Sequence, residues 1–222
     1  MSPMTPYRSL LVMHGVGVGK CHAIDTPILM HDGTVKRVQD IKPGEQLMGD
    51  DSKPRTVVSL ARGSDMMYDV HQTMGDTYRV NSEHILVLKN LNDNIIEIEV
   101  QEYLKLSEYE RGQLRGYTAF VEFPETPLKV NAYQQALKFN GTIDKSILTN
   151  SSKVRLQYLF GLVTSIATVN DTSIIIPHVS DDLTYFGRSL GFGVTHTTFT
   201  TFHKYNLAHI HVTPCLLYTS PS

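Results

Sequence analysis

The chain has 222 residues, of which 41% are hydrophobic and 19% charged, a composition typical of a folded protein with one or two domains. Its formal net charge of −2 gives no bulk electrostatic reason to expect nucleic-acid binding, and no apolar run reaches the roughly 20 residues of a membrane span, so no membrane partner is expected. Two cysteines, Cys21 and Cys215, cannot form a disulfide framework, and no CxxC pair suggests a zinc site, so a reducing intracellular setting is expected.

The first 20 residues predict a strand, Ser9–Met13, followed by a glycine-rich turn. Gly17, Gly19 and Lys20 fit the phosphate-binding pattern GxxxxGK[ST]. Cys21, however, stands where that pattern has the hydroxyl that holds Mg²⁺, and a thiol is a poor ligand for this hard ion. Pro27 also disfavours the helix that such a loop needs behind it. Cys21 and Pro27 therefore argue against the alternative that this chain is a fragment of a nucleotide-hydrolysing ATPase or helicase.

Short strands separated by turn signals fill the chain from residue 21 to residue 122. Asp32-Gly33 and Lys42-Pro43-Gly44-Glu45 are turn sequences in which glycine can take a positive φ. The predicted strands or alternating runs are Thr26–Met30, Val35–Ile41, Arg55–Ala61, Met67–Gln72, Thr77–Val80, Ile85–Leu88 and Ile95–Val100. This pattern predicts a mainly β unit over residues 21–127.

Helical patterns follow from residue 100 onward. The predicted helices are Val100–Tyr109, Asn131–Phe139, Ser152–Ala167 with Ser152 as N-cap, and Asp181–Leu190, which ends before Gly191. Strands are predicted at Ser173–Ile176 and around His209 and His211, and Phe123–Pro127 is predicted to be a linker. Residues 128–213 are therefore expected to form a small α+β unit.

The segment CHAIDTPILMHDGTVKRVQDIKPGEQLMGDD, which begins at Cys21, resembles the opening of an intein, a protein-splicing element with the Hint fold. The matching positions are Cys21, Asp25-Thr26, Asp32-Gly33, Asp40-Ile41, Gly44-Glu45 and Gly49-Asp50. The resemblance implies that residues 1–20 belong to a host ATPase or helicase, a partner in cis whose last residue before the junction is Lys20. After splicing, Gly17, Gly19 and Lys20 would lie in the host's nucleotide-binding loop, and splicing itself needs no cofactor.

A second motif of inteins, Thr-x-x-His, resembles Asn81-Ser82-Glu83-His84, with Asn in the place of Thr. The implied reaction is an N–S acyl shift, in which the Cys21 thiol attacks the Lys20 carbonyl and forms a thioester. His84 is then the expected general acid for the leaving amine and Asn81 the donor to the oxyanion, while Thr26 orients the Cys21 segment. Such a process is autocatalytic and happens once per molecule, unlike the action of a turnover enzyme.

The second unit resembles the LAGLIDADG homing endonucleases found within large inteins. The matching positions are Asn150-Ser151, Arg155-Leu156 and Leu159-Phe160-Gly161-Leu162-Val163. Thr164 and Ile166 stand where that family has the acids that hold divalent metal ions. We therefore expect a degenerate remnant without a metal, in which Gly161 allows close helix packing and some residual DNA contact is left open. A DNA-cleaving LAGLIDADG enzyme and a hedgehog-type autoprocessing module remain as alternatives.

Inteins end in a His-Asn pair that follows two further strands, and FHKYNLAHIHVTPCLLYTSPS contains no such pair. The expectation is a monomer, mainly β, whose Hint β-horseshoe lacks its C-terminal strands and which performs at most the first splicing step. The ending LLYTSPS resembles translated sequencing-adaptor sequence, so residues 214–222 are expected to be an artefactual tail, and Cys215 is given no role. The interrupted host motif suggests a viral source.

Overall fold

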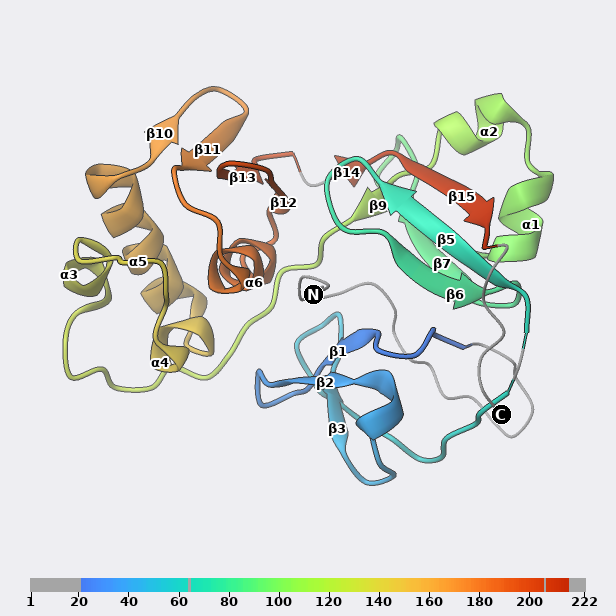
Figure 1. Ribbon diagram of the computed structural model, residues 1–222, viewed down its shortest axis with the longest axis horizontal. Helices are drawn as coiled ribbons and strands as arrows, with labels where there is room; N and C mark the ends of the chain where they lie inside the picture. Colours follow the sequence, from blue (N-terminus) through green and yellow to red (C-terminus); the bar gives the residue numbers. More distant parts are fainter. Residues whose placement is uncertain (1–20, 64, 206, 216–222) are drawn as a thin grey trace.

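The computed structural model describes residues 21–63, 65–205 and 207–215. The predicted strand Ser9–Met13 and the residues Gly17, Gly19 and Lys20 lie outside the described residues. Figure 1 shows a mainly β half and, beside it, a half built from helices α3 to α6 and strands β10 to β13. Within the described ranges, no helix has both the length and the apolar character needed to cross a bilayer.

The mainly β half consists of short antiparallel strands. Its two-stranded sheets include β1 (Pro27–Leu29) with β2 (Val35–Arg37), β3 (Gln46–Met48) with β4 (Pro54–Thr56), and β7 (Ile85–Lys89) with β8 (Ile95–Glu99). A three-stranded sheet has the order β15–β5–β6, with β5 (Met67–Gln72) between β6 (Tyr78–Asn81) and β15 (Ile210–Pro214). The predicted strand Met67–Gln72 is confirmed at both ends.

Alternating side chains give this three-stranded sheet a buried face. Val70, Val80 and Val212 point into a core that also contains Leu86, Leu88, Val100 and Tyr103. The polar residues between them, Asp69 and Arg79, form an ion pair whose Nε–Oδ1 distance is 2.7 Å. The period of two in the sequence is thus the origin of the sheet's two-sided character.

Two predicted elements are interrupted in the structure. The run Val35–Ile41 is a strand only as far as Arg37, after which Val38–Asp40 form a 3₁₀ turn. The single helix expected over Val100–Tyr109 is two helices, α1 (Val100–Lys105) and α2 (Glu108–Gly112). Ser107 starts the second one with a capping box, because its side chain accepts from the N–H of Glu110 while the Glu110 carboxylate accepts from the N–H of Ser107.

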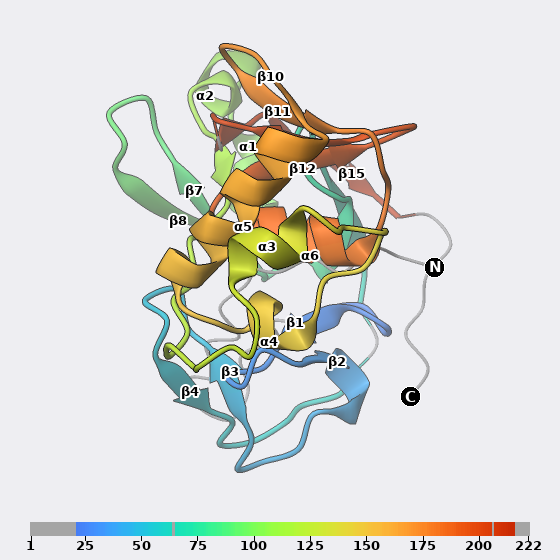
Figure 2. The same cartoon turned by 90° about the vertical axis from the view of Figure 1, so that its left-hand side faces the viewer.

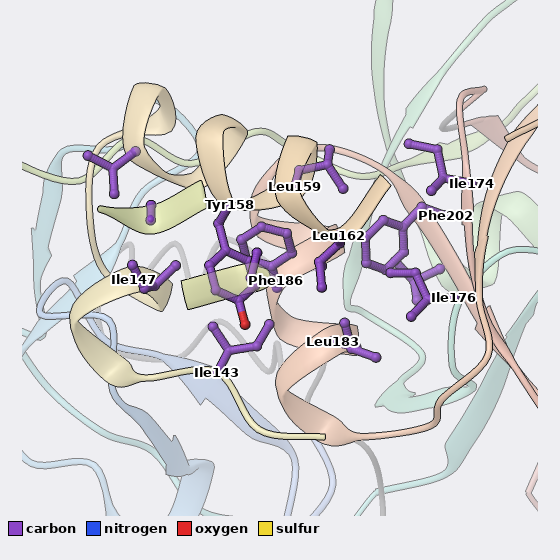
Figure 3. Packing of buried hydrophobic residues seen from close by; sticks show 14 residues of the cluster. Ile143, Ile147, Tyr158, Leu159, Leu162, Ile174, Ile176, Leu183, Phe186 and Phe202 are labelled. Atoms are coloured by element: carbon purple, nitrogen blue, oxygen red, sulfur yellow. The ribbon is translucent and has the colours of Figure 1, made fainter. Parts of the chain in front are cut away.

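The α+β half packs helices against a four-stranded antiparallel sheet. The helices are α3 (Ala132–Ala136), α4 (Lys145–Leu148), α5 (Ser152–Ser165) and α6 (Asp181–Ser189). The strands, in sheet order, are β10 (Thr168–Val169), β11 (Ser173–Ile176), β13 (Thr200–His203) and β12 (Gly193–His196). In the core shown in Figure 3, the rings of Tyr158 and Phe186 meet edge to face, and their centroids are 5.5 Å apart.

Helix α5 begins one residue earlier than its predicted cap implied. Its N-cap is Ser151, not Ser152, because the Ser151 hydroxyl accepts from the N–H of Val154. Gly161 lies where α5 meets α3, and a Cβ there would be 2.5 Å from the Cβ of Ala136 and 2.7 Å from the carbonyl oxygen of Tyr133. The expectation that Gly161 permits close helix packing is therefore confirmed.

The end of the described chain returns to the β half. Strand β14 (Leu207–Ala208) pairs with β9 (Gly116–Tyr117), and β15 lies along β5 (Figure 1). The sequence placed residues 128–213 in the second unit, and the structure differs, because β14 and β15 complete sheets of the first. Strand pairing between segments so distant in sequence leaves no local signal, apart from the strand expected around His209 and His211.

The two halves share a hydrophobic core. Phe123, the first residue of the predicted linker, and Val121 just before it are buried together with Leu29, Met48 and Tyr185. In Figure 2, α4 lies next to the β1–β2 hairpin, whose turn residue Gly33 has its carbonyl oxygen 3.1 Å from the hydroxyl of Tyr185. Residues 121–123 are thus a packed connection rather than a loose one.

Candidate functional site

Cys21 is held at the edge of β6 by backbone hydrogen bonds. The N–H of Asn81 donates to the carbonyl oxygen of Cys21 at 3.1 Å, and the N–H of Ala23 donates to that of Arg79 at 3.0 Å. Between them, His22 forms an antiparallel bridge with Val80. The segment from Cys21 to Ala23 therefore extends the three-stranded sheet beyond β6.

Asn81 binds the peptide N–H that follows Lys20. Its side-chain oxygen accepts from the N–H of Cys21 at 2.9 Å, and its side-chain nitrogen donates to Oδ2 of Asp65 at 2.9 Å. These two partners fix the orientation of the amide, because a backbone N–H requires the oxygen and a carboxylate requires the nitrogen. The sequence assigned Asn81 a donor role toward an oxyanion, whereas this arrangement presents an acceptor to the nitrogen of the Lys20–Cys21 bond.

His84 comes from the same turn as Asn81. Its N–H donates to the Asn81 carbonyl oxygen at 3.2 Å, so the spacing N-x-x-H closes one tight turn between β6 and β7. The side chain is buried, with 4% of the residue exposed, and its ring centroid is 4.7 Å from that of His22 at an interplanar angle of 66°. The structure thus brings Cys21, Asn81 and His84, three residues chosen from the sequence, to one end of β6.

Thr26 shapes the chain just after Cys21. Its hydroxyl donates to the carbonyl oxygen of Ala23 at 2.7 Å, and its N–H donates to the same oxygen at 3.2 Å. Asp25, inside this turn, has a positive φ of 65°. Thr26 therefore contacts the Cys21 segment through the backbone of Ala23.

The surroundings of the Cys21 thiol disfavour its thiolate. Burial raises the pKa of Cys21 above its ordinary value, and the carboxylates of Asp65 and Glu83 raise it further. At neutral pH the sulfur therefore carries its proton, and an attack by this thiol requires that the proton be removed as the reaction proceeds.

Two neighbours of the site, His22 and Asp65, were not found by sequence reasoning. His22 directly follows the candidate nucleophile, which was the one available signal, and the sequence shows no motif around it. Asp65 lies in an irregular segment before β5 and is brought to Asn81 only by the fold. A single sequence carries no pattern for such a contact.

Cys21 and Cys215 cannot reach each other in this fold. The N–H of Cys215 donates to the Met67 carbonyl oxygen on β5, and β6 lies between β5 and the Cys21 segment. Three strand spacings correspond to about 14 Å, too far for a disulfide. Across the residues that the structure describes, no group of three or more His, Cys, Asp or Glu side chains is arranged to hold a metal ion.

The two positions that replace the endonuclease acids lie at the end of α5. The hydroxyl of Thr164 donates within its own helix, to the carbonyl oxygens of Phe160 and Gly161, both at 3.1 Å. Ile166 is the C-cap residue of α5. Neither side chain contributes a carboxylate to this end of the helix.

Comparison with known proteins is consistent with the geometry around Cys21. Residues 21–116 match the family model described as Hom_end-associated Hint, and the match begins at Cys21 itself. The chain is also 35% identical over 83 residues to the catalytic subunit of the V-type proton ATPase of Candida tropicalis, a match that covers 33% of this chain and 8% of that protein. Residues 21–116, somewhat less than half of the chain, are therefore similar in sequence to a Hint-type, intein-like domain.

Proposed function

We propose that this chain performs the first step of protein splicing, an N–S acyl shift at the Lys20–Cys21 bond. The observation that carries the proposal is the hydrogen bond from the N–H of Cys21 to the side-chain oxygen of Asn81. It holds the nitrogen that must leave the Lys20 carbonyl. The start of the family match at Cys21 supports the same position for the junction.

The proposed step rearranges atoms within the chain. The Cys21 sulfur forms a bond to the carbonyl carbon of Lys20, the bond between that carbon and the Cys21 nitrogen breaks, and a thioester and a free amine result. The thiol proton is released and the amine nitrogen gains a proton, so the step is a balanced isomerisation. His84 supplies the proton to the leaving nitrogen, Asn81 orients that nitrogen, and Thr26 holds the segment that follows.

The host in this proposal is an ATPase or helicase, with residues 1–20 as its fragment. The relative that aligns over 83 residues is named as the catalytic part of an ATPase, which favours an ATPase host. Gly17, Gly19 and Lys20 would then complete a nucleotide-binding loop once splicing has joined the host sequences.

For the α+β half we propose a degenerate LAGLIDADG remnant that does not cleave DNA. Thr164 uses its hydroxyl within α5, and Ile166 has no polar atom with which to hold a metal ion. Incubation of the protein with Mg²⁺ and DNA of the uninterrupted host gene tests this part. Specific cleavage of that DNA would contradict it.

Thiol-induced cleavage tests the acyl shift. The full chain is purified, and circular dichroism verifies that it is folded. It is then treated with dithiothreitol or hydroxylamine, which attack a thioester far faster than an amide. Mass spectrometry is expected to find residues 1–20 released, and Cys21→Ala is expected to release nothing. If the parent chain releases no fragment, or if Cys21→Ala releases it equally well, the proposed function is wrong.

A further inference from the structure

His22 directly follows the candidate nucleophile in the chain, and its ring contacts the ring of the candidate acid. Its backbone follows Cys21 and bridges to Val80 of β6, which fixes where its side chain starts. Its ring meets the ring of His84 edge to face, with 4.7 Å between the centroids. A contact of this kind limits the positions that the His84 ring can take.

The imidazole of His22 is an unusual choice for this place. The residue as a whole is partly exposed, but neither ring nitrogen is accessible to solvent or has a hydrogen-bond partner among the described residues. Burial lowers the pKa of His22 from 6.5 to about 4, so the ring is neutral at neutral pH. An apolar ring would fill the same space without unsatisfied nitrogens, which indicates that packing alone does not explain the histidine.

We propose that His22 is a positioning residue for His84: its neutral ring fixes the His84 imidazole at this end of β6, so that His84 alone carries the proton for the leaving amine. The inference rests on the proposed acyl shift. Two adjacent imidazolium rings would repel each other, so one member of the pair must remain neutral for the other to act as an acid. Enclosure of both nitrogens makes His22 the neutral member.

The charged groups near this pair come from the elements packed around it. The carboxylates of Asp65, before β5, and Glu83, in the β6–β7 turn, act on the adjacent Cys21. Arg79 of β6 is paired with Asp69 of β5 on the polar face of the sheet, and Tyr103 of α1 belongs to the same buried cluster as Val80. Burial lowers the pKa of His22, so the ring is a weak base because it is enclosed and not because a cation lies next to it.

The first measurement uses the unmodified chain and does not depend on cleavage. Nuclear magnetic resonance of the histidine ring protons between pH 5 and 8 is expected to show a His22 signal that does not titrate, together with a nuclear Overhauser contact between the rings of His22 and His84. A His22 ring that titrates within this range, or a missing contact, would overturn the inference whether or not the chain splices.

The second measurement compares His22→Phe with His71→Phe, a matched change on the polar side of the same sheet. His22→Phe keeps a ring but removes the imidazole, and is expected to slow thiol-induced release of residues 1–20 at least tenfold at pH 7 and to shift the midpoint of its pH–rate profile. His71→Phe is expected to leave rate and midpoint unchanged. If the parent chain cleaves and the His22→Phe variant has the same rate and pH–rate profile, the positioning role is refuted. If the parent chain does not cleave, the proposed function is refuted instead.

Discussion

Nη1 of Arg188 on α6 lies 2.7 Å from Oδ2 of Asp76 in the turn between β5 and β6, across a separation of 112 residues. Only 3% of the Arg188 side chain and 18% of the Asp76 side chain are exposed. The pair joins the α+β half to the hairpin that ends in Asn81. The second half therefore supports the strand on which the candidate site is built.

Arg188→Met is expected to lower the free energy of unfolding by about 2–4 kcal/mol, because it leaves the Asp76 carboxylate largely buried without this partner. Urea denaturation measures the change. Arg37→Met is the matched control, since Arg37 and Asp25 form an exposed pair at 3.1 Å, and its cost should stay below about 1 kcal/mol. Equal losses in the two variants would show that the Arg188 pair does not join the halves.

Gly33→Ala is expected to destabilise the protein more than Gly44→Ala. Both glycines have a positive φ, 79° and 88°, at which alanine costs about 1 kcal/mol or slightly more. A Cβ at Gly33 would also collide with the side chain of Thr149, whereas nothing lies within 4 Å of one at Gly44. Thermal and urea unfolding should therefore show about 1–3 kcal/mol of additional loss at Gly33. Similar losses would mean that the hairpin turn does not pack against α4.

Asn81→Ala is expected to reduce thiol-induced release of residues 1–20 by about 100-fold, because the Cys21 N–H then loses the acceptor that orients it. Asn92→Ala, in an exposed turn, serves as the control and should leave the rate unchanged. Circular dichroism separates loss of activity from loss of fold. A folded Asn81→Ala variant with the parent rate would remove Asn81 from the mechanism.

Asp65→Asn is expected to lower the pKa of Cys21 without returning it to its ordinary value. Burial, which is the largest cause of the raised pKa, remains, and so does the Glu83 carboxylate. In a Cys215→Ser background, the rate of iodoacetamide alkylation against pH reports the thiolate of Cys21. The alkylation midpoint should move to lower pH in Asp65→Asn. A midpoint that stays or rises would show that Asp65 does not act on the thiol.

The buried ring nitrogens of His22 predict loss of stability in acid. The pKa of His22 is about 4 in the folded chain against 6.5 ordinarily, so the unfolded chain binds a proton that the folded chain does not. The free energy of unfolding should therefore decrease as the pH falls from about 6.5 toward 4, by up to about 3 kcal/mol from this residue. His203, whose pKa burial also lowers, acts in the same direction. His22→Phe should flatten the pH dependence between these values, and an unchanged slope would show that His22 is not the source.

Local patterns were sufficient for part of this architecture. The strands Met67–Gln72 and Ser173–Ile176 have the predicted bounds because their apolar residues lie between clear turn signals. The grouping of Cys21, Asn81 and His84 came from resemblance, and the fold brings them together because the N-x-x-H spacing closes a turn beside the Cys21 segment. Two-residue strands such as β9, β10 and β14 have no detectable period, and their pairing is decided by tertiary packing. Contacts such as Asp65 to Asn81 and His22 to His84 involve side chains that no local pattern relates.

The pairing of β15 with β5 has a consequence for the order of events during synthesis. Strand β6 follows its partner β5 after a few residues of chain. Strand β15, the other partner of β5, emerges from the ribosome only after the whole α+β half has been made. Strand pairing over such a separation is slow to form, because a long loop must close first. The sheet beside the Lys20–Cys21 bond is therefore completed late, and chemistry that depends on its rigidity is delayed until residues 210–214 have arrived.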